Sequence, residues 1–275
     1  MMQQFSVSMC VYEKDNPAWF RQAVDSILDQ TVKPSEVVLV VDGPIPEELN
    51  QAVLTYARNP DFRVIRLPEN TGHGNARRTG LKNCTYELVA LMDADDISAP
   101  DRFEKQLALF ADHPELAVVG GNITEFIDTP DNVVGARMVE TTDAAIKEDM
   151  RRRCPMNQVT VIFRKSAVEQ AGGFIDWFCE EDYYLWLRLF LEGAAFANIP
   201  ESLVNVRIGK DMYQRRGGWK YFSSEARLQK YMLNMQIIDF GTCFINITKR
   251  FIVQVLLPNR IRGWVFQKFA RKRVS

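Results

Sequence analysis

The sequence predicts an α/β protein with a mostly parallel central sheet flanked by helices. Segments typical of strands and of helices alternate through residues 1–112 in the order β-α-β-α-β-α-β-α. Residues 37–41 and 88–92 are apolar without a polar break, which is typical of strands buried on both faces. Right-handed crossovers between parallel strands bring the carboxyl ends of the strands to one edge of the sheet.

Length and composition are those of an ordinary globular protein. A chain of 275 residues with 47% hydrophobic and 25% charged residues suits one large domain, or one domain with an appendage. The five cysteines form no C-x-x-C pair and the chain has two histidines, so we expect reduced cysteines rather than a zinc site or a disulfide framework. We also expect no signal peptide and no membrane-spanning helix.

Four strands and four helices are predicted in the first half. Pro17 suits the first turn of a helix, and Phe20, Val24 and Ile27 recur at helical spacing along one face. The strands are predicted at residues 5–12, 35–41, 63–67 and 87–92; the helices are predicted from residue 17, over 46–58, after the loop 69–80, and over 102–111.

Carboxylates follow three of these strands. Glu13 follows the first, Asp42 the second, and Asp93 and Asp95 the fourth. This edge of an open α/β sheet is where ligands bind, and Mg²⁺ or Mn²⁺ prefers one or two carboxylates together with phosphate oxygens. The alternative is a polar turn in which Asp96 or Ser98 caps the helix that begins near Pro100.

The glycine-containing loop over residues 72–80 is a second candidate for ligand binding. It has neither the dinucleotide fingerprint nor the spacing of a P-loop. It can still place backbone N–H groups and Arg77 near an anion. In the alternative interpretation this is a plain helix N-terminus with Arg77 and Arg78 solvated.

The second half is predicted to be mixed α/β and less regular. Glu180, Glu181 and Asp182 open an amphipathic helix, where acids complement the helix dipole and can cap the first turn. In the functional interpretation one of these carboxylates is a general base. The basic loop over 210–219 either folds over a diphosphate or is solvated. Strands are predicted at residues 117–126, 133–139, 158–164, 195–199 and 203–206, and helices at 144–153 and 166–170.

The C-terminal segment is strongly basic. Residues 207–275 carry 15 Lys and Arg against 3 Asp and Glu, whereas residues 1–206 carry 19 against 32. Apolar clusters between residues 237 and 274 alternate with basic residues, which is typical of a helix lying on an anionic membrane leaflet. In the alternative the tail packs on the body with its charges solvated. The basic residues are Lys249, Arg250, Arg260, Arg262, Lys268, Arg271, Lys272 and Arg273.

Several motifs occur in an order that resembles the family 2 glycosyltransferases, over roughly residues 4–220. The most specific pair is the D-x-D at Asp93–Asp95 and the E-D at Glu181–Asp182, with Gly172-Gly173-Phe174 just before the latter. The others are Val7–Tyr12, Val40–Gly43, Asn70–Arg77 and Pro100–Gln106. Within the family the chain is similar to bacterial exopolysaccharide and O-antigen enzymes, including amylovoran-type transferases.

The resemblance implies a GT-A, or nucleotide-diphospho-sugar transferase, fold with a donor site. Asp42 would accept a hydrogen bond from the uracil imide, Asp93 would contact the ribose or the sugar, and Asp95 would hold Mn²⁺ or Mg²⁺. The residues that the resemblance places at the nucleotide sugar are Val11, Glu13, Asp42, Arg77, Asp93, Asp95, Arg215, Arg216 and Trp219.

The resemblance also implies the reaction. Asp182 would take the proton of the attacking hydroxyl while Glu181 orients the acceptor, so that in-line attack inverts the anomeric centre. The implied partners are a UDP-sugar, a glycan or lipid-linked acceptor and an anionic membrane, without nucleic acid. The implied location is cytoplasmic, on the inner face of the membrane, in surface-polysaccharide synthesis.

Two departures and two rival functions accompany the resemblance. Val41 stands where many relatives carry a first aspartate before Asp42, and the Q-x-x-R-W signature of processive synthases is absent in strict form, which favours single additions. The rivals are a sugar-1-phosphate nucleotidyltransferase and a non-catalytic nucleotide-sugar-binding subunit. The expected organisation is a domain over 1–220, with a nucleotide half (1–112) and an acceptor half (113–220), and a basic helical segment over 221–275.

Overall fold

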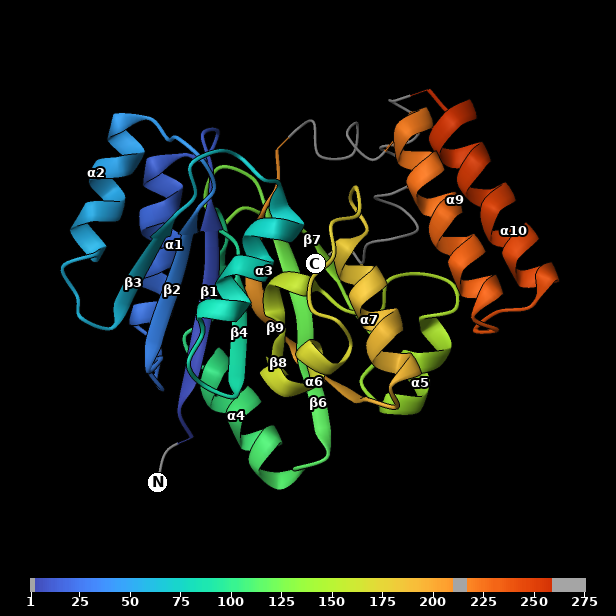
Figure 1. Cartoon of the computed structure of the whole chain (residues 1–275), viewed down its shortest axis with the longest axis horizontal. Helices are drawn as coiled ribbons and strands as arrows, with labels where there is room; N and C mark the ends of the chain where they lie inside the picture. The colour runs from blue at the N-terminus through green and yellow to red at the C-terminus, as the bar shows by residue number, and fades with distance from the viewer. Residues whose placement is uncertain (1–2, 210–216, 259–275) are drawn as a thin grey trace.

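A nine-stranded sheet runs through the computed structural model, which describes residues 3–209 and 217–258 (Figure 1). The strand order is β3-β2-β1-β4-β8-β6-β9-β5, and β7 pairs with β6 off this path. The strands are β1 (Phe5–Val11), β2 (Glu36–Val41), β3 (Phe62–Arg66), β4 (Leu88–Met92), β5 (Ile97–Ser98), β6 (Leu116–Phe126), β7 (Val133–Arg137), β8 (Ile162–Arg164) and β9 (Ala195–Arg207).

The sheet changes character at β8. Strands β3, β2, β1 and β4 are all parallel, whereas β8 is antiparallel to both β4 and β6, and β5 and β7 are also antiparallel to their partners. Strand β6 runs parallel to β9. The predicted parallel first half and mixed second half are therefore confirmed.

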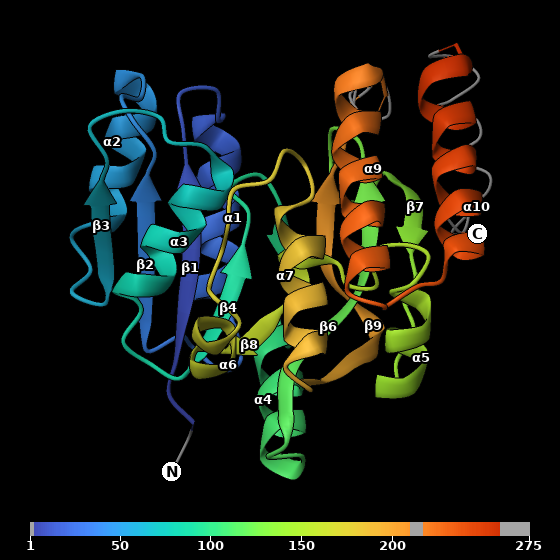
Figure 2. The same ribbon diagram turned by 45° about the vertical axis from the view of Figure 1, so that its right-hand side comes forward.

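Helices cover both faces of the sheet and define two apolar layers (Figure 2). Side chains of α1, α2 and α4 pack with Phe5, Val7 and Met9 of β1 on one face. Side chains of α3, α5, α6, α7, α9 and α10 pack with Val89 and Leu91 of β4 on the other. The helices are α1 (Pro17–Leu28), α2 (Glu47–Tyr56), α3 (His73–Asn83), α4 (Arg102–Asp112), α5 (Asp143–Asp149), α6 (Lys165–Gln170), α7 (Glu181–Leu191), α9 (Trp219–Asn234) and α10 (Phe240–Phe251).

Two predicted segments differ from the structure. Residues 158–164 begin as a 3₁₀ turn (Gln158–Thr160), and only Ile162–Arg164 form a strand. The two short strands predicted after residue 195 are one strand, β9, which pairs along the whole of β6. Ile199 pairs with Gly121 and Ser202 with Asn122, so Pro200 falls in a bulge where no ladder N–H is needed.

The C-terminal helices pack on the second apolar layer. Leu228 and Met232 of α9, Ile237 and Ile238 of the following turn, and Cys243 of α10 are buried in it. This agrees with the alternative in which the tail packs on the body. A π-helical turn (Ile252–Leu256) ends the described part of the tail. Within the described residues, none of the helices combines the length and the apolar content needed to span a bilayer.

A buried polar pair fixes α4 to the sheet. Arg102 is fully buried, and its guanidinium donates to the Leu91 carbonyl at 2.9 Å and to Gln106 Oε1 at 3.0 Å. The Gln106 amide donates in turn to the carbonyls of Val119 and Thr160, both at 2.8 Å. This pair therefore joins β4, α4, β6 and the 3₁₀ turn.

We predict that Gln106→Leu destabilises the protein by about 2–4 kcal/mol, because it leaves several buried polar groups without partners. Urea unfolding followed by tryptophan fluorescence measures the loss. The matched control is Gln51→Leu on the exposed face of α2, which should change the free energy of unfolding by less than about 0.5 kcal/mol. Equal effects of the two substitutions would contradict this role of Gln106.

Candidate functional site

The three aspartates after β4 do not form a simple helix cap. Asp96 is buried, and its Oδ1 accepts the backbone N–H of Arg207 at 2.8 Å. The Ser98 N–H donates to Ser26 Oγ at 3.0 Å, and the N-cap of α4 is Asp101, without a side-chain capping bond. The capping interpretation of Asp96 and Ser98 is therefore wrong.

Arg207, the last residue of β9, holds the D-x-D turn in place. Its Nε donates to the Asp95 carbonyl at 3.1 Å, and its guanidinium carbon lies 4.8 Å from the Trp19 ring centroid and 4.6 Å from that of Phe126. The other guanidinium nitrogens donate to Gln22 Oε1 and to the Asp128 carbonyl. The end of the last strand thus fixes the backbone that presents Asp95.

Negative charge accumulates at this edge of the sheet. Burial raises the pKa of Asp15 from 3.8 to about 6, with further contributions from the charges of Asp95 and Asp93. The pKa of Asp96 is raised for the same reasons, burial first. Carboxylates that repel one another in this way fit a site completed by a cation.

The donor set also fits a metal that needs few protein ligands. Among residues 3–209 and 217–258, no group of three or more His, Cys, Asp and Glu side chains is placed to hold a metal ion by itself. Mg²⁺ and Mn²⁺ bound with a nucleotide use one or two carboxylates and take further oxygens from the phosphates. Asp93 pairs with Arg77, and Asp95 stays the metal ligand that the family resemblance implies.

Arg77 is buried at the centre of the site. Its side chain is 1% exposed, and its guanidinium pairs with Asp93 and donates from Nε to His73 Nε2 at 3.1 Å. The third nitrogen, Nη1, is buried and has no hydrogen-bond partner in the structure. The interpretation of Arg77 as solvated is therefore wrong. Arg78 donates to the Phe174 carbonyl at 2.6 Å.

His73 connects Arg77 to the E-D motif. Its Nδ1 lies 2.6 Å from Glu181 Oε1, at the first residue of α7. Burial alone would raise the pKa of Glu181, but the hydrogen bond to His73 and the charge of Arg77 outweigh it and lower that pKa. Glu181 is thus held as a carboxylate.

The neighbouring Asp182 has a contrasting environment. Burial, followed by the charge of Glu181, raises the pKa of Asp182 from 3.8 to about 6. Asp182 Oδ1 accepts the Tyr183 N–H at 2.7 Å, and the Cys154 thiol lies 3.7 Å from Oδ2. Two adjacent carboxyl groups with opposite pKa shifts are suited to different roles, one fixed in charge and one exchanging a proton.

The third acidic residue, Glu180, interacts with Glu225 of α9. It is the N-cap residue of α7 but makes no side-chain capping bond, and burial and the charge of Glu225 raise its pKa. Glu225 of α9 pairs with Arg250 of α10 at 2.8 Å and accepts a hydrogen bond from Gln254. Arg250 is therefore committed within the protein, although the sequence pattern placed it among the lipid-facing basic residues.

Asp42 organises the loop that leads into α3. Its carboxylate is 4% exposed and accepts hydrogen bonds from Thr71 N (2.8 Å), Thr71 Oγ1 (2.9 Å) and Gly72 N (3.1 Å). Gly43 has φ +87°, and a Cβ there would lie 2.6 Å from Asn70 N, so the close approach of the two loops requires glycine. The predicted contact of Asp42 with uracil stays a prediction.

The remaining predicted donor residues that the structure describes differ in exposure. The Val11 side chain is buried in the core, whereas Glu13 is exposed. Trp219 is 65% exposed and packs against Phe222 and Phe251. Arg215 and Arg216 lie outside the described residues.

Sequence reasoning missed several contributors. Asp15 lies two residues beyond Glu13 and could have been found from its place after the first strand. His73 lies inside the loop already singled out. For Arg207 and Cys154 no local signal exists, because their partners are 28 or more residues away in the chain.

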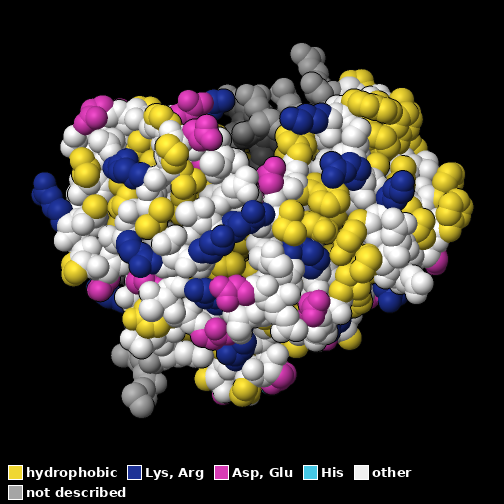
Figure 3. Space-filling model, in the orientation of Figure 1, with side chains coloured by type: hydrophobic (Ala, Val, Ile, Leu, Met, Phe, Trp, Pro, Cys, Tyr) yellow, Lys and Arg dark blue, Asp and Glu magenta, His cyan; other side chains and the backbone are white. Residues whose placement is uncertain are grey.

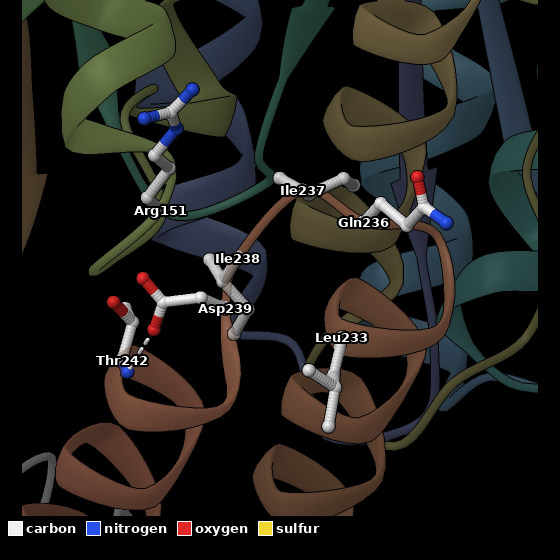
Figure 4. Close-up of a pocket in the computed structure, with 7 residues that line it drawn as sticks. All are labelled: Arg151, Leu233, Gln236, Ile237, Ile238, Asp239 and Thr242. Atoms are coloured by element: carbon white, nitrogen blue, oxygen red, sulfur yellow. Dashed lines mark hydrogen bonds between the residues drawn. The ribbon is translucent and has the colours of Figure 1, made fainter.

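A separate hollow of about 450 Å³ lies at the turn between α9 and α10 (Figure 4). Its lining mixes apolar and polar side chains, with Arg151 on one side and Asp239 capping α10 at Thr242 N. Among the described residues, none of the predicted donor or catalytic side chains lines it. The residues around it are Arg151, Leu233, Gln236, Ile237, Ile238, Asp239 and Thr242.

The sequence matches the family profile described as Glycosyl transferase family 2 over residues 6–171. The chain belongs to this family. The match covers β1 to α6 and so includes the D-x-D turn and the Arg77 loop, which confirms the family predicted from the motifs.

Relatives of this glycosyltransferase are similar over nearly their whole length. An uncharacterised glycosyltransferase of Haemophilus influenzae is 38% identical, covering 98% of this chain and 100% of the relative. The amylovoran biosynthesis glycosyltransferase AmsE of Erwinia amylovora is 35% identical, covering 96% and 98%. An Escherichia coli UDP-Gal:α-D-GlcNAc-diphosphoundecaprenol β-1,3-galactosyltransferase is 33% identical, covering 98% and 97%.

Solved structures confirm the GT-A fold. S. aureus TarS 1–349 in complex with UDP-GlcNAc superposes with a TM-score of 0.68 at 15% identity, covering 97% of this glycosyltransferase and 76% of that chain. This glycosyltransferase spans 44% of a longer TarS chain. The mannosyltransferase PcManGT of Pyrobaculum calidifontis, in complex with GDP-Man and Mn²⁺, gives a TM-score of 0.62 at 17% identity, covering 95% and 72%.

Proposed function

We propose that this glycosyltransferase moves a sugar, with inversion, from a UDP-sugar to a hydroxyl of a glycan or lipid-linked acceptor in bacterial surface-polysaccharide synthesis. The observation that carries the proposal is the meeting of the two motifs. Asp93 of the D-x-D and Glu181 of the E-D are joined through Arg77 and His73 at one edge of the sheet. The names of the relatives support the substrate class.

On the donor side, the chain's own residues bind and orient. Arg77, paired with Asp93, would lie beside the nucleotide, and Asp93 would contact the ribose or the sugar. Asp95 would hold Mn²⁺ or Mg²⁺, which when bound offsets the charge that develops on the departing UDP. A metal in a related mannosyltransferase supports this assignment.

On the acceptor side, Asp182 acts as the general base. It takes the proton of the acceptor hydroxyl as the oxygen bonds to the anomeric carbon and the bond from that carbon to UDP breaks. Glu181 stays ionised and orients the acceptor. A carboxylate with a pKa of about 6 is ionised at neutral pH and still basic enough to accept a proton in the transition state.

The rival functions fit less well. Nucleotidyl transfer needs a glycine-rich loop after the first strand, where this chain has Tyr12-Glu13-Lys14-Asp15. A non-catalytic subunit has no need for a carboxyl pair with opposed pKa shifts beside the donor edge. We also propose single additions rather than processive polymerisation, since the Q-x-x-R-W signature of processive synthases occurs only as a loose echo at Gln214–Trp219.

Metal-dependent UDP binding is the first test of this function. We expect calorimetric titration of UDP to show binding that requires Mn²⁺, with GDP as the nucleotide control, and we expect Asp95→Ala to abolish this metal-dependent binding. Asp131→Ala, which removes an exposed carboxylate in the turn before β7, is the matched control and should bind as the parent protein does. A folded parent protein that binds no nucleotide would overturn the donor site.

The pH dependence of transfer tests Asp182. Because the active form is deprotonated, kcat/KM should be level above about pH 7 and should fall about tenfold per pH unit below a pKa of about 6. Glu181→Gln removes the second-largest cause of the raised pKa and should move the acid limb to lower pH. Asp182→Asn should lower kcat by about 10²–10⁴-fold. Transfer by Asp182→Asn at near-parental rate would place the base elsewhere.

We further propose that the enzyme works as a peripheral protein on the inner face of the cytoplasmic membrane. Hydrophobic side chains, with Lys and Arg among them, gather over the side of the molecule that carries α9 and α10 (Figure 3). The exposed ones recur at helical spacing on α10 and the π-helical turn. They are Phe240, Phe244, Ile245, Ile252 and Leu256, from 45% to 74% exposed.

Point substitutions test the membrane proposal better than truncation, since removing residues 237 onward would uncover the core. The double variant Phe240→Ser/Phe244→Ser should weaken sedimentation with phosphatidylglycerol-containing vesicles by about tenfold or more, because each phenylalanine buries apolar surface in the leaflet. Leu54→Ser, at a 45%-exposed leucine on α2, is the control. Unchanged vesicle binding by the double variant would refute this docking face.

A further inference from the structure

A continuous hydrogen-bonded chain runs from the D-x-D to the E-D motif through one histidine. Asp93 pairs with the Arg77 guanidinium, Arg77 Nε donates to His73 Nε2 at 3.1 Å, and His73 Nδ1 lies 2.6 Å from Glu181 Oε1. Arg77 is buried and Glu181 is 13% exposed, whereas His73 is 46% exposed. The histidine is therefore the solvent-facing link between two carboxylates on different elements.

The partners of His73 determine its tautomer. A guanidinium carries only N–H donors, so Nε2 of His73 must present its lone pair to Arg77. In a neutral ring the proton then resides on Nδ1, where it faces the Glu181 carboxylate. A cationic ring would place its Nε2–H against the N–H of Arg77 Nε. The opposite tautomer would do the same and would also place the Nδ1 lone pair against the lone pairs of the Glu181 carboxylate.

We propose that His73 is a positioning residue that, as the neutral Nδ1–H tautomer, couples the donor-side Arg77–Asp93 pair to the acceptor-side Glu181. This inference rests on the proposed transfer reaction and deepens it. Through His73, the position of the guanidinium that faces the donor sets the position of the carboxylate that orients the acceptor.

The chain offers matched variants. In glutamine the amide oxygen can accept from Arg77 while the amide nitrogen donates to Glu181, so His73→Gln reproduces both bonds without a titrating group. His73→Leu has a similar size and can make neither bond. His113, the other histidine of the chain, lies beyond α4 next to Glu115 and provides the control His113→Leu.

Kinetics with the substrate pair named for the E. coli relative, UDP-galactose and a short-chain analogue of GlcNAc-diphosphoundecaprenol, separate the roles. His73→Leu should lower kcat by about 10- to 100-fold and raise the acceptor KM, because Glu181 loses its fixed position, while UDP affinity changes less than about twofold. His73→Gln should recover most of the lost rate. Parental kinetics in His73→Leu, or no recovery in His73→Gln, would overturn the proposal.

The tautomer of His73 can be measured by NMR even if the protein shows no turnover. With ¹⁵N-labelled histidine the protein has two imidazoles, and the His113→Leu spectrum assigns those of His73. We expect a protonated Nδ1 and an unprotonated Nε2 for His73 at neutral pH. The Nε2–H tautomer would overturn the coupling. A protein that shows the Nδ1–H tautomer but neither binds UDP nor transfers sugar would contradict the proposed transfer function and would still support the contact of His73 with Arg77 and Glu181.

Discussion

The pairing of a buried guanidinium with a half-exposed carboxylate is the contact on which the site depends. Arg77 enters from the second turn of α3, and Asp93 follows β4. Burying a cation is unfavourable unless it is paired, so the Asp93 contact compensates for burying Arg77, and His73 supplies an acceptor for its Nε. The pair ties α3 to the turn after β4, at the edge of the sheet where the donor is proposed to bind.

The acceptor side depends on the second apolar layer. Helix α7 presents Glu181 and Asp182 at its first turn, and α9 and α10 support that turn through Glu225 and Arg250. The same two helices turn an apolar face outward. One hairpin therefore both supports the carboxylates proposed to be catalytic and carries the surface proposed to meet the membrane, which would keep a lipid-linked acceptor close to them.

Much of the fold and part of the site could be predicted from local pattern. Apolar runs and helix-start residues such as Pro17 located the four parallel strands and four helices of the first half, because those signals act within one turn or strand. The two-residue strand β5 (Ile97–Ser98) was missed, since it is defined only by its pairing with β9. Strand β9 was divided in the prediction at Pro200, since only pairing with β6 shows that a bulge accommodates it. The two carboxyl motifs were found from their spacing, but the partners that hold them were not.

The sequence by itself determined most of the order of elements, the family, and the two carboxyl motifs, D-x-D and E-D. Hydrophobic periodicity and strand ends depend on residues that are close together in the chain, so they can be inferred from the sequence. Only the tertiary structure decided that Arg77 is buried, that Asp96 binds the backbone of Arg207, and that His73 reaches Glu181. These contacts join residues far apart in the chain, and their energies depend on burial, which no local pattern specifies.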